Sequence, residues 1–192
     1  MRFFEQFPPP DREEPEPDEQ PPPPSWAKPE AMLGAAVPAE FVLGRGDEAV
    51  VGLSGITAYP NGFSFSITAV LRHEDRHGRA FRLGFHHDFF DEEPPSEGFF
   101  RLGVQFADGA AATNLGYPML PPDAQPDPPL LVQDSGGGGG RKYEMSYWVW
   151  PLPPPGPVTF VCEWPAYGIA ETRAVVEAGL ILDAVERVVP LV

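Results

Sequence analysis

A strict two-residue alternation of apolar and polar side chains over residues 63–72 constrains the fold more than any other feature of the chain. The apolar positions are Phe63, Phe65, Ile67, Ala69 and Leu71. Because successive side chains of a β-strand point to opposite faces, this period predicts a strand with one buried face and one face in water. Tyr59-Pro60-Asn61-Gly62 directly before it has the residues of a tight turn, so we expect a hairpin over residues 49–72.

The same pattern predicts two further hairpins. Residues 100–106 alternate around Phe100, Leu102, Val104 and Phe106, and Asp108-Gly109 then turns the chain into residues 110–115. In the third, one side of a strand carries Trp148, Trp150 and Leu152, and one side of the next carries Val158, Phe160, Cys162 and Trp164. The proline cluster at 153–157 marks where pairing stops. We interpret these tryptophans as core residues.

The rest of the body completes the expected fold. Residues 169–178 are a further candidate strand, and Ile181, Ala184, Val185 and Val188 recur at helical spacing in a short segment that Pro190 ends. The long stretches 72–98 and 116–142 are predicted as loops, the second ending in a five-glycine hinge. We therefore expect an all-β antiparallel sandwich, immunoglobulin-like or Greek-key, of about seven to eight strands with a short C-terminal helix.

The first 35 residues have a different composition. Residues 5–30 contain ten of the 27 prolines and only two bulky apolar side chains, Phe7 and Trp26. Such a segment buries too little surface to offset its ordering entropy, so residues 1–35 are predicted as a disordered acidic tail and residues 36–192 as the domain. The stretch PPPPSW also has the spacing of a peptide that docks into an aromatic groove, although a solubilising tail is the simpler interpretation.

HEDRH at 73–77 matches the H-E-x-x-H zinc motif, in which two histidines one helical turn apart bind the metal and the glutamate is the general base. That chemistry requires a helix, because the same spacing in a strand separates the histidines by roughly 13 Å. The preceding residues have strand alternation, so we interpret HEDRH as a polar loop after a strand. His86 and His87, with the acidic residues that follow, could supply further ligands but define no coordination geometry. We therefore assign no catalytic, cofactor or metal residue.

Charge and cysteine content exclude several classes of function. The formal net charge of -15 repels nucleic-acid phosphate and anionic membranes and favours a basic partner. The single cysteine, Cys162, lies among apolar neighbours and is expected to be a small buried hydrophobe in a reducing compartment. The chain has neither a leader-like apolar segment nor a run of about 18 apolar residues, so we expect a cytoplasmic protein.

Three blocks of the sequence together resemble an uncharacterised family of small bacterial proteins: AYPNGFSF (58–65), GVQFADG (103–109) and YWVWPLPPPGPVTFVCEWPAYGI (147–169). The resemblance implies a β-rich body and carries over no catalytic residue.

These observations leave three functional hypotheses. The first is a non-enzymatic protein-binding or adaptor module, because sandwiches recognise partners through loops and sheet edges. The second is a zinc-dependent metallohydrolase built on His73, Glu74 and His77, with a third ligand from His86, His87 or a nearby carboxylate. The third is an acidic antagonist or immunity-type protein that caps a basic partner.

Overall fold

The computed structural model describes residues 22–75, 78, 96–116, 120 and 124–192. These residues form the strands β1 (Met32–Leu33), β2 (Ala35–Ala36), β3 (Phe41–Arg45), β4 (Ala49–Tyr59), β5 (Gly62–Leu71), β6 (Arg101–Gln105), β7 (Ala111–Thr113), β8 (Leu130–Gly139), β9 (Lys142–Trp150), β10 (Pro157–Trp164), β11 (Ile169–Glu177) and β12 (Val189–Pro190). A short 3-10 turn, Pro165–Tyr167, and the helix α1 (Ala178–Val185) complete the described elements.

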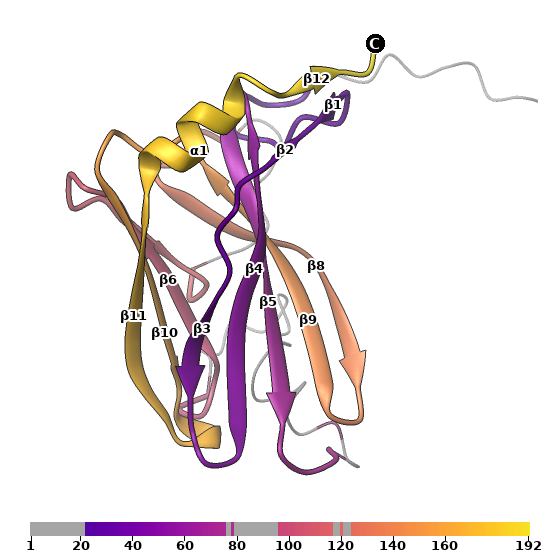
Figure 1. Cartoon of the computed structure of the whole chain (residues 1–192), viewed down its shortest axis with the longest axis vertical. Coiled ribbons are helices and arrows are strands. Elements are labelled where there is room, and N and C mark those ends of the chain that lie inside the picture. Colours follow the sequence, from indigo (N-terminus) through magenta and orange to yellow (C-terminus); the bar gives the residue numbers. More distant parts are fainter. Residues whose placement is uncertain (1–21, 76–77, 79–95, 117–119, 121–123) are drawn as a thin grey trace, which may run out of the picture.

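The strands form two facing sheets and a small two-stranded ribbon (Figure 1). One sheet has the order β2-β4-β5-β9-β8 with β3 also paired to β4, and the other has the order β11-β10-β6-β7. Hairpins alternate between the sheets along the chain, and every described pairing is antiparallel. Eight of the described strands have five or more residues. The predicted all-β antiparallel sandwich with a short C-terminal helix is thus confirmed.

Two of the predicted hairpins are present with the expected turns. β4 and β5 pair from Ala49↔Leu71 to Tyr59↔Gly62, and β6 pairs with β7 across the turn at 107–110. Within β4, Gly55 has φ +62 at a bulge, and the bulge keeps Ile56 on the buried side after the register shift.

The third predicted hairpin is wrong in its pairing, although both of its strands exist. β9 belongs to the six-stranded sheet, where it lies between β5 and β8, whereas β10 lies between β6 and β11 in the other sheet. The proline-rich connector 151–156 therefore crosses from one sheet to the other. Because proline has no backbone N–H, this segment could not extend the ladder of either sheet.

The glycine run is part of a strand rather than a hinge. Gly136 to Gly139 pair with β9 from Met145 to Lys142, so β8 and β9 form a hairpin inside the segment predicted as a loop. A β-carbon on Gly138 would lie 2.6 Å from Tyr143 Cα, and one on Gly136 would lie 2.7 Å from Met145 Cγ. Glycine is a poor strand former, but atoms of β9 occupy the space that a side chain at Gly136 or Gly138 would need.

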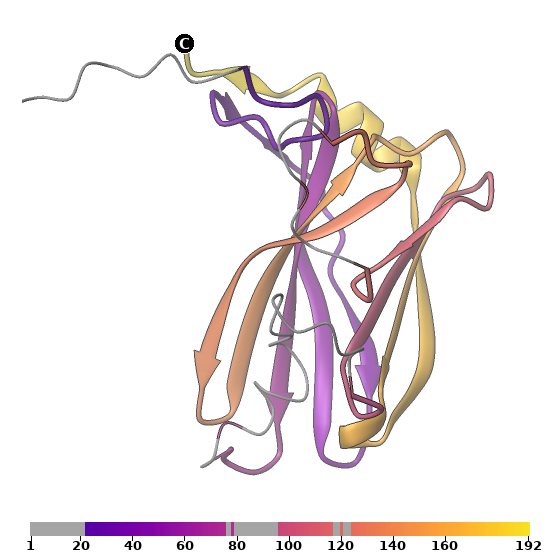
Figure 2. The same ribbon diagram turned by 180° about the vertical axis from the view of Figure 1, so that it is seen from behind.

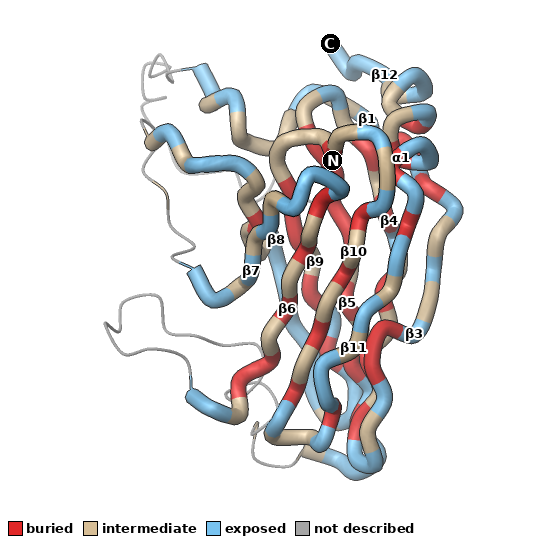
Figure 3. Tube along the Cα trace, turned by 90° about the vertical axis from the view of Figure 1, so that its left-hand side faces the viewer, coloured by how far each residue is buried: buried red, intermediate tan, exposed pale blue. Residues whose placement is uncertain are grey.

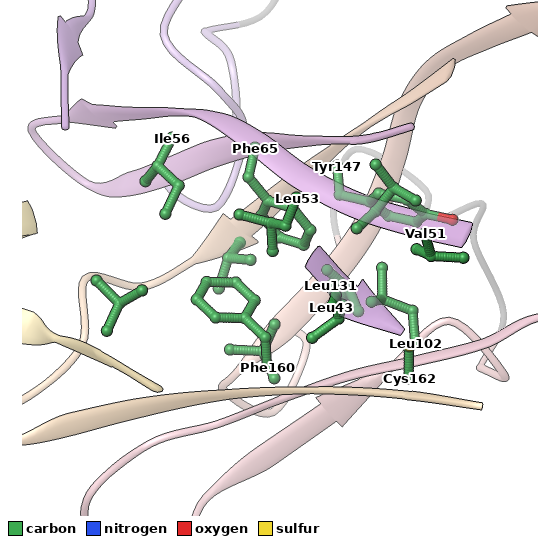
Figure 4. Packing of buried hydrophobic residues seen from close by; sticks show 14 of the residues in the cluster. Leu43, Val51, Leu53, Ile56, Phe65, Leu102, Leu131, Tyr147, Phe160 and Cys162 are labelled. Atoms are coloured by element: carbon green, nitrogen blue, oxygen red, sulfur yellow. The ribbon is translucent and has the colours of Figure 1, made fainter. Parts of the chain in front are cut away.

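The core lies between the two sheets and consists of the inward-facing apolar side chains of their strands (Figures 3 and 4). Phe160 of β10 packs edge-on against Phe65 of β5, with ring centroids 5.1 Å apart, and Phe65 stacks on Tyr147 of β9 at 5.6 Å. The predicted core positions of residues 63–71, 100–106 and 158–164 are all buried. The apolar residues that alternate in the sequence are therefore the ones that pack between the two sheets.

One edge of the sandwich is closed by side chains, and one end is covered by the helix. Thr172 Oγ1 of β11 donates a 2.6 Å hydrogen bond to the carbonyl of Leu43 in β3, which links the two sheets. α1 lies at the end of the sandwich where β4 turns into β5, with Ile181 and Ala184 buried against the core (Figure 1). The helix ends at Val185, earlier than predicted, and Val189–Pro190 then pair with Met32–Leu33.

The N-terminal part of the body begins earlier than residue 36. Residues 1–21 of the predicted tail lie outside the described residues, but residues 24–35 contact the sheets. Ala35↔Ala58 and Ala36↔Thr57 pair β2 with β4, and the segment before β1 crosses the same end of the sandwich (Figure 2). This segment has few apolar residues, so its composition did not predict the hydrogen bonds that involve Trp26 and Trp148.

Candidate functional site

Of the four histidines singled out in the sequence, only His73 lies in the part of the chain that the structure describes. β5 ends at Leu71 and a bend follows, so the region before His73 is a strand, as predicted. His73 and Glu74 are exposed, whereas His77, His86 and His87 lie outside the described residues. Among the described residues, no three His, Cys, Asp or Glu side chains gather as a metal site would require. The helix on which the zinc motif depends is therefore not formed over residues 67–75.

Asp75 has a structural contact at this end of the sandwich. Its backbone N–H donates to the carbonyl of Gly140 at 2.8 Å, and its carboxylate accepts a 3.1 Å hydrogen bond from Tyr143 Oη. Burial of Tyr143, together with the hydrogen bond and charge of Asp75, raises the pKa of the phenol to about 12. The pair therefore fixes the chain after β5 against the β8–β9 hairpin.

Cys162 is a buried core residue, as predicted. Its side chain is 1% exposed, and its Sγ lies 3.3 Å from Thr172 Oγ1. Burial raises the pKa of the thiol, with a smaller opposing effect of the hydrogen bond to Thr172. Since the thiolate is the reactive form, this environment suits packing rather than nucleophilic chemistry.

The outer face of the six-stranded sheet carries an aromatic cluster where β4, β5 and β9 meet. Tyr59 and Trp148 pack edge-to-face with ring centroids 5.6 Å apart, and Trp150 lies two residues further along β9. Trp148 is only 4% exposed, yet it does not belong to the cluster between the sheets. We call Tyr59, Asn61, Trp148 and Trp150 the aromatic face. Trp148 is thus buried, as predicted, but outside the cluster between the sheets, and Trp150 is only partly buried.

Residues 24–28 cover this aromatic face, and we call them the strap. Asn61 Nδ2 donates to the carbonyls of Ser25 and Ala27, both at 2.8 Å. Trp148 Nε1 donates to the carbonyl of Trp26 at 2.8 Å. Asn61 of the β4–β5 turn and Trp148 of β9 thus bind three consecutive backbone carbonyls of the strap. The strap itself pairs with none of the described strands.

The strap also inserts two of its own side chains into contacts with the sheet and the 124–129 segment. Trp26 Nε1 donates to the carbonyl of Ala124 at 2.9 Å, beside a hollow of about 510 Å³ bordered by Gln125, Pro126 and Trp150. Lys28 Nζ lies 2.7 Å from Asp134 Oδ2 and 5.6 Å from the centroid of the Tyr59 ring. The ammonium group therefore combines an ion pair with a cation–π contact.

The turn between β4 and β5 is shaped to allow this arrangement. A β-carbon on Gly62 would lie 2.7 Å from the Trp148 ring and closer still to the carbonyl of Val149. Glycine at this position thus lets the indole of Trp148 approach the turn closely, while the adjacent Asn61 side chain reaches the strap. The same Asn-Gly pair that predicts the turn also builds the face.

Sequence reasoning missed the aromatic face, although the parity of β9 contains the signal. Tyr143, Met145, Tyr147 and Val149 face the core, so Trp148 and Trp150 share the other side of the strand with Lys142, Glu144 and Ser146. Large aromatic residues on the polar side of an alternating strand indicate a second buried or binding surface. At the end of β9, residues 147–150 are all apolar or aromatic, so alternation does not show which of them face the core.

The outer face of the four-stranded sheet has a shallower hollow of about 260 Å³. Its charges are matched: Arg101 pairs with Glu163 at 2.7 Å, and Arg173 pairs with Glu171 at 2.9 Å. Because each of these arginines already has a carboxylate partner, this surface has less chemistry to offer a ligand than the aromatic face.

No described helix is long and apolar enough to cross a membrane. Comparison with known proteins adds no identification: no family model matches the chain, and no curated protein or solved structure is significantly similar to it.

Proposed function

We propose that this chain is a non-enzymatic binding module that takes an extended segment of a partner protein onto the aromatic face. The observation that carries the proposal is the set of three hydrogen bonds from Asn61 and Trp148 to the carbonyls of residues 25–27. In this arrangement the strap occupies the face as an intramolecular ligand.

Donors that bind backbone carbonyls above aromatic rings are the means by which proline-rich peptides are recognised elsewhere. A proline-rich segment keeps its carbonyls free and loses little entropy on binding, because its backbone is already extended. The strap begins at Pro24 after a run of prolines, so its own sequence has this property. A partner segment of similar character could make the same contacts.

The strap is held weakly enough for exchange. Four side-chain hydrogen bonds contribute about 1 kcal/mol each, and the Lys28 contacts with Asp134 and Tyr59 add about 1 kcal/mol. Partial burial of Trp26 and the covering of Trp148 by the strap add roughly 2 kcal/mol each. Ordering five residues costs about 1–2 kcal/mol each, so the opposing sums are of similar size. A competing segment therefore has only a small free-energy difference to overcome.

The nature of the partner follows from charge. A net charge of -15 repels phosphate backbones and favours a protein with a basic surface, and we place this interaction in the cytoplasm.

Fluorescence anisotropy of a labelled peptide with the sequence of residues 20–31 tests the proposal. The receptor is the full chain, either wild type or with Trp26→Ala, which loosens the strap. We expect the variant to bind the peptide about tenfold more tightly than the wild type, because the intramolecular copy no longer competes. Absence of binding to both proteins would contradict the proposal.

A second substitution in the Trp26→Ala chain locates the site. Trp148→Phe retains a ring but removes the indole donor, and we expect severalfold weaker binding of the same peptide. Gln105→Ala, on the outer face of the four-stranded sheet, is the matched control and should leave the affinity unchanged.

A further inference from the structure

The side chains of the strap differ in how they contact the rest of the molecule. This difference indicates which residues a ligand must contain. Trp26 and Lys28 both make specific contacts, through the carbonyl of Ala124 and the carboxylate of Asp134. Ser25, by contrast, is exposed and contributes only its carbonyl. The recognised pattern is therefore an aromatic residue two positions before a lysine.

The tryptophan position is specified by a donor as well as by shape. The indole N–H of Trp26 reaches a backbone carbonyl 98 residues away in sequence, at the border of the hollow lined by Pro126 and Trp150. A phenylalanine could fill part of this space but could not donate to Ala124. A site that hydrogen-bonds a particular group rejects ligands that lack it, because the acceptor is then left unpaired.

The lysine position is specified by charge. The Lys28 ammonium group contacts both the Asp134 carboxylate and the ring of Tyr59. Only two lysines occur in the chain, and one of them occupies this position. The net negative charge of the whole chain adds a general attraction for basic segments, which salt screens beyond about a Debye length.

We infer that the partner segment is extended and basic, with a tryptophan two residues before a lysine, and that it binds by displacing the strap. This inference rests on the proposed function and specifies the ligand of the same face. Asn61 and Trp148 bind the backbone of the segment, the Ala124 carbonyl accepts from its indole, and Asp134 with Tyr59 receives its ammonium group.

A charge-exchange experiment tests this specificity in the full chain carrying Trp26→Ala and Lys28→Ala. Three labelled peptides are compared by anisotropy: the sequence of residues 20–31, the same peptide with lysine replaced by glutamate, and the same peptide with tryptophan replaced by alanine. We expect the parent peptide to bind and each altered peptide to bind about tenfold less tightly. Adding Asp134→Lys should reverse the preference between the lysine and glutamate peptides.

Asp183→Lys is the matched control, because it makes the same change of charge at an exposed position of α1. It should leave the order of the three affinities unchanged. Equal binding of all three peptides would overturn the inference while leaving the proposed function in place. Failure of all three to bind would overturn both.

Discussion

Tyr143 shows how one buried side chain makes the stability of the fold depend on pH. Its hydroxyl donates to Asp75, and burial followed by the contacts with that carboxylate raises its pKa from 10.0 to about 12. Because the folded-state pKa is the higher one, protonated Tyr143 stabilises the fold fully below pH 10. This contribution is lost as pH rises through about 12.

We therefore expect the urea midpoint of wild type to fall more steeply between pH 10 and 12 than that of Tyr143→Phe. Asp75→Asn should lower the pKa of Tyr143 but leave it above 10, since burial remains the larger cause. Difference absorbance titration of wild type against Tyr143→Phe measures this pKa directly. A phenol that titrates near 10 in the wild type would contradict the assignment.

Two neighbouring glycines of β8 provide a matched test of the strand assignment. A β-carbon at Gly138, where φ is +153, would lie 2.6 Å from Tyr143 Cα, whereas one at Gly137 meets nothing within 4 Å. Gly138→Ala should lower the free energy of unfolding by about 1–3 kcal/mol, and Gly137→Ala should change it by less than about 0.5 kcal/mol. Urea unfolding of both variants checks this. Equal effects would support a flexible hinge instead.

At the residue scale, regular alternation in the sequence correctly predicts which side chains are buried between the sheets. It fails in β9, where side chains on both sides of the strand are buried. Phe63 and Phe160 are buried between the sheets as expected. Trp148 is equally inaccessible for another reason, since residues 24–28 cover it from outside. Hydrophobicity alone does not distinguish these cases, because covering an aromatic ring from either side of a sheet removes it from water.

Among the elements, the contact between β3 and β11 closes one edge of the sandwich. Thr172 Oγ1 donates to the Leu43 carbonyl at 2.6 Å, so Thr172→Val removes the donor while retaining the shape of the side chain. We expect the variant to lose about 1–2 kcal/mol of unfolding free energy. Thr159→Val is the control, because the hydroxyl of Thr159 makes no hydrogen bond within the described part of the chain. Equal urea midpoints for the two variants would contradict this role of Thr172.

The hairpins show what sequence can and cannot predict about elements. Asn61-Gly62 and Asp108-Gly109 permit a tight reversal, so the strands beside them pair as expected. The connector 151–156 also separates two strands, but its prolines exclude pairing and lead the chain into the opposite sheet. Local turn chemistry predicts nearest-neighbour pairs, whereas the pairing of β5 with β9 depends on contacts distant in sequence.

For the whole molecule, the acidic surface should govern association with a basic ligand. The peptide of residues 20–31 contains Glu30 as well as Lys28, so this test uses the peptide with Glu30→Gln, which carries a net positive charge. The net charge of -15 attracts that peptide at low ionic strength, and salt screens this attraction. We expect the affinity of the strap-loosened chain for the peptide to fall severalfold between about 0.05 and 0.5 M salt. Anisotropy titrations over this range measure the slope. An affinity independent of salt would show that the overall charge has no part in recognition.

The charge of the whole chain predicts the class of partner, but the position of the site could not be predicted from the sequence. Its donors lie on the β4–β5 turn and on β9, and its present occupant comes from the segment before β1. Folding joins residues separated by 122 positions, as in the bond from Trp148 to Trp26. The docking-peptide interpretation of PPPPSW stays a prediction, and the contacts that residues 24–28 make could not be predicted because they depend on the tertiary fold.

The central claim is that a partner segment replaces the strap on the aromatic face. The indole N–H signals of the four tryptophans in the ¹⁵N-labelled full chain test it during titration with the unlabelled peptide of residues 20–31. We expect the Trp26 signal to move to the position of an exposed indole, while Trp148 changes and Trp164, buried between the sheets, stays fixed. A Trp26 signal that remains in place at saturating peptide would contradict the claim.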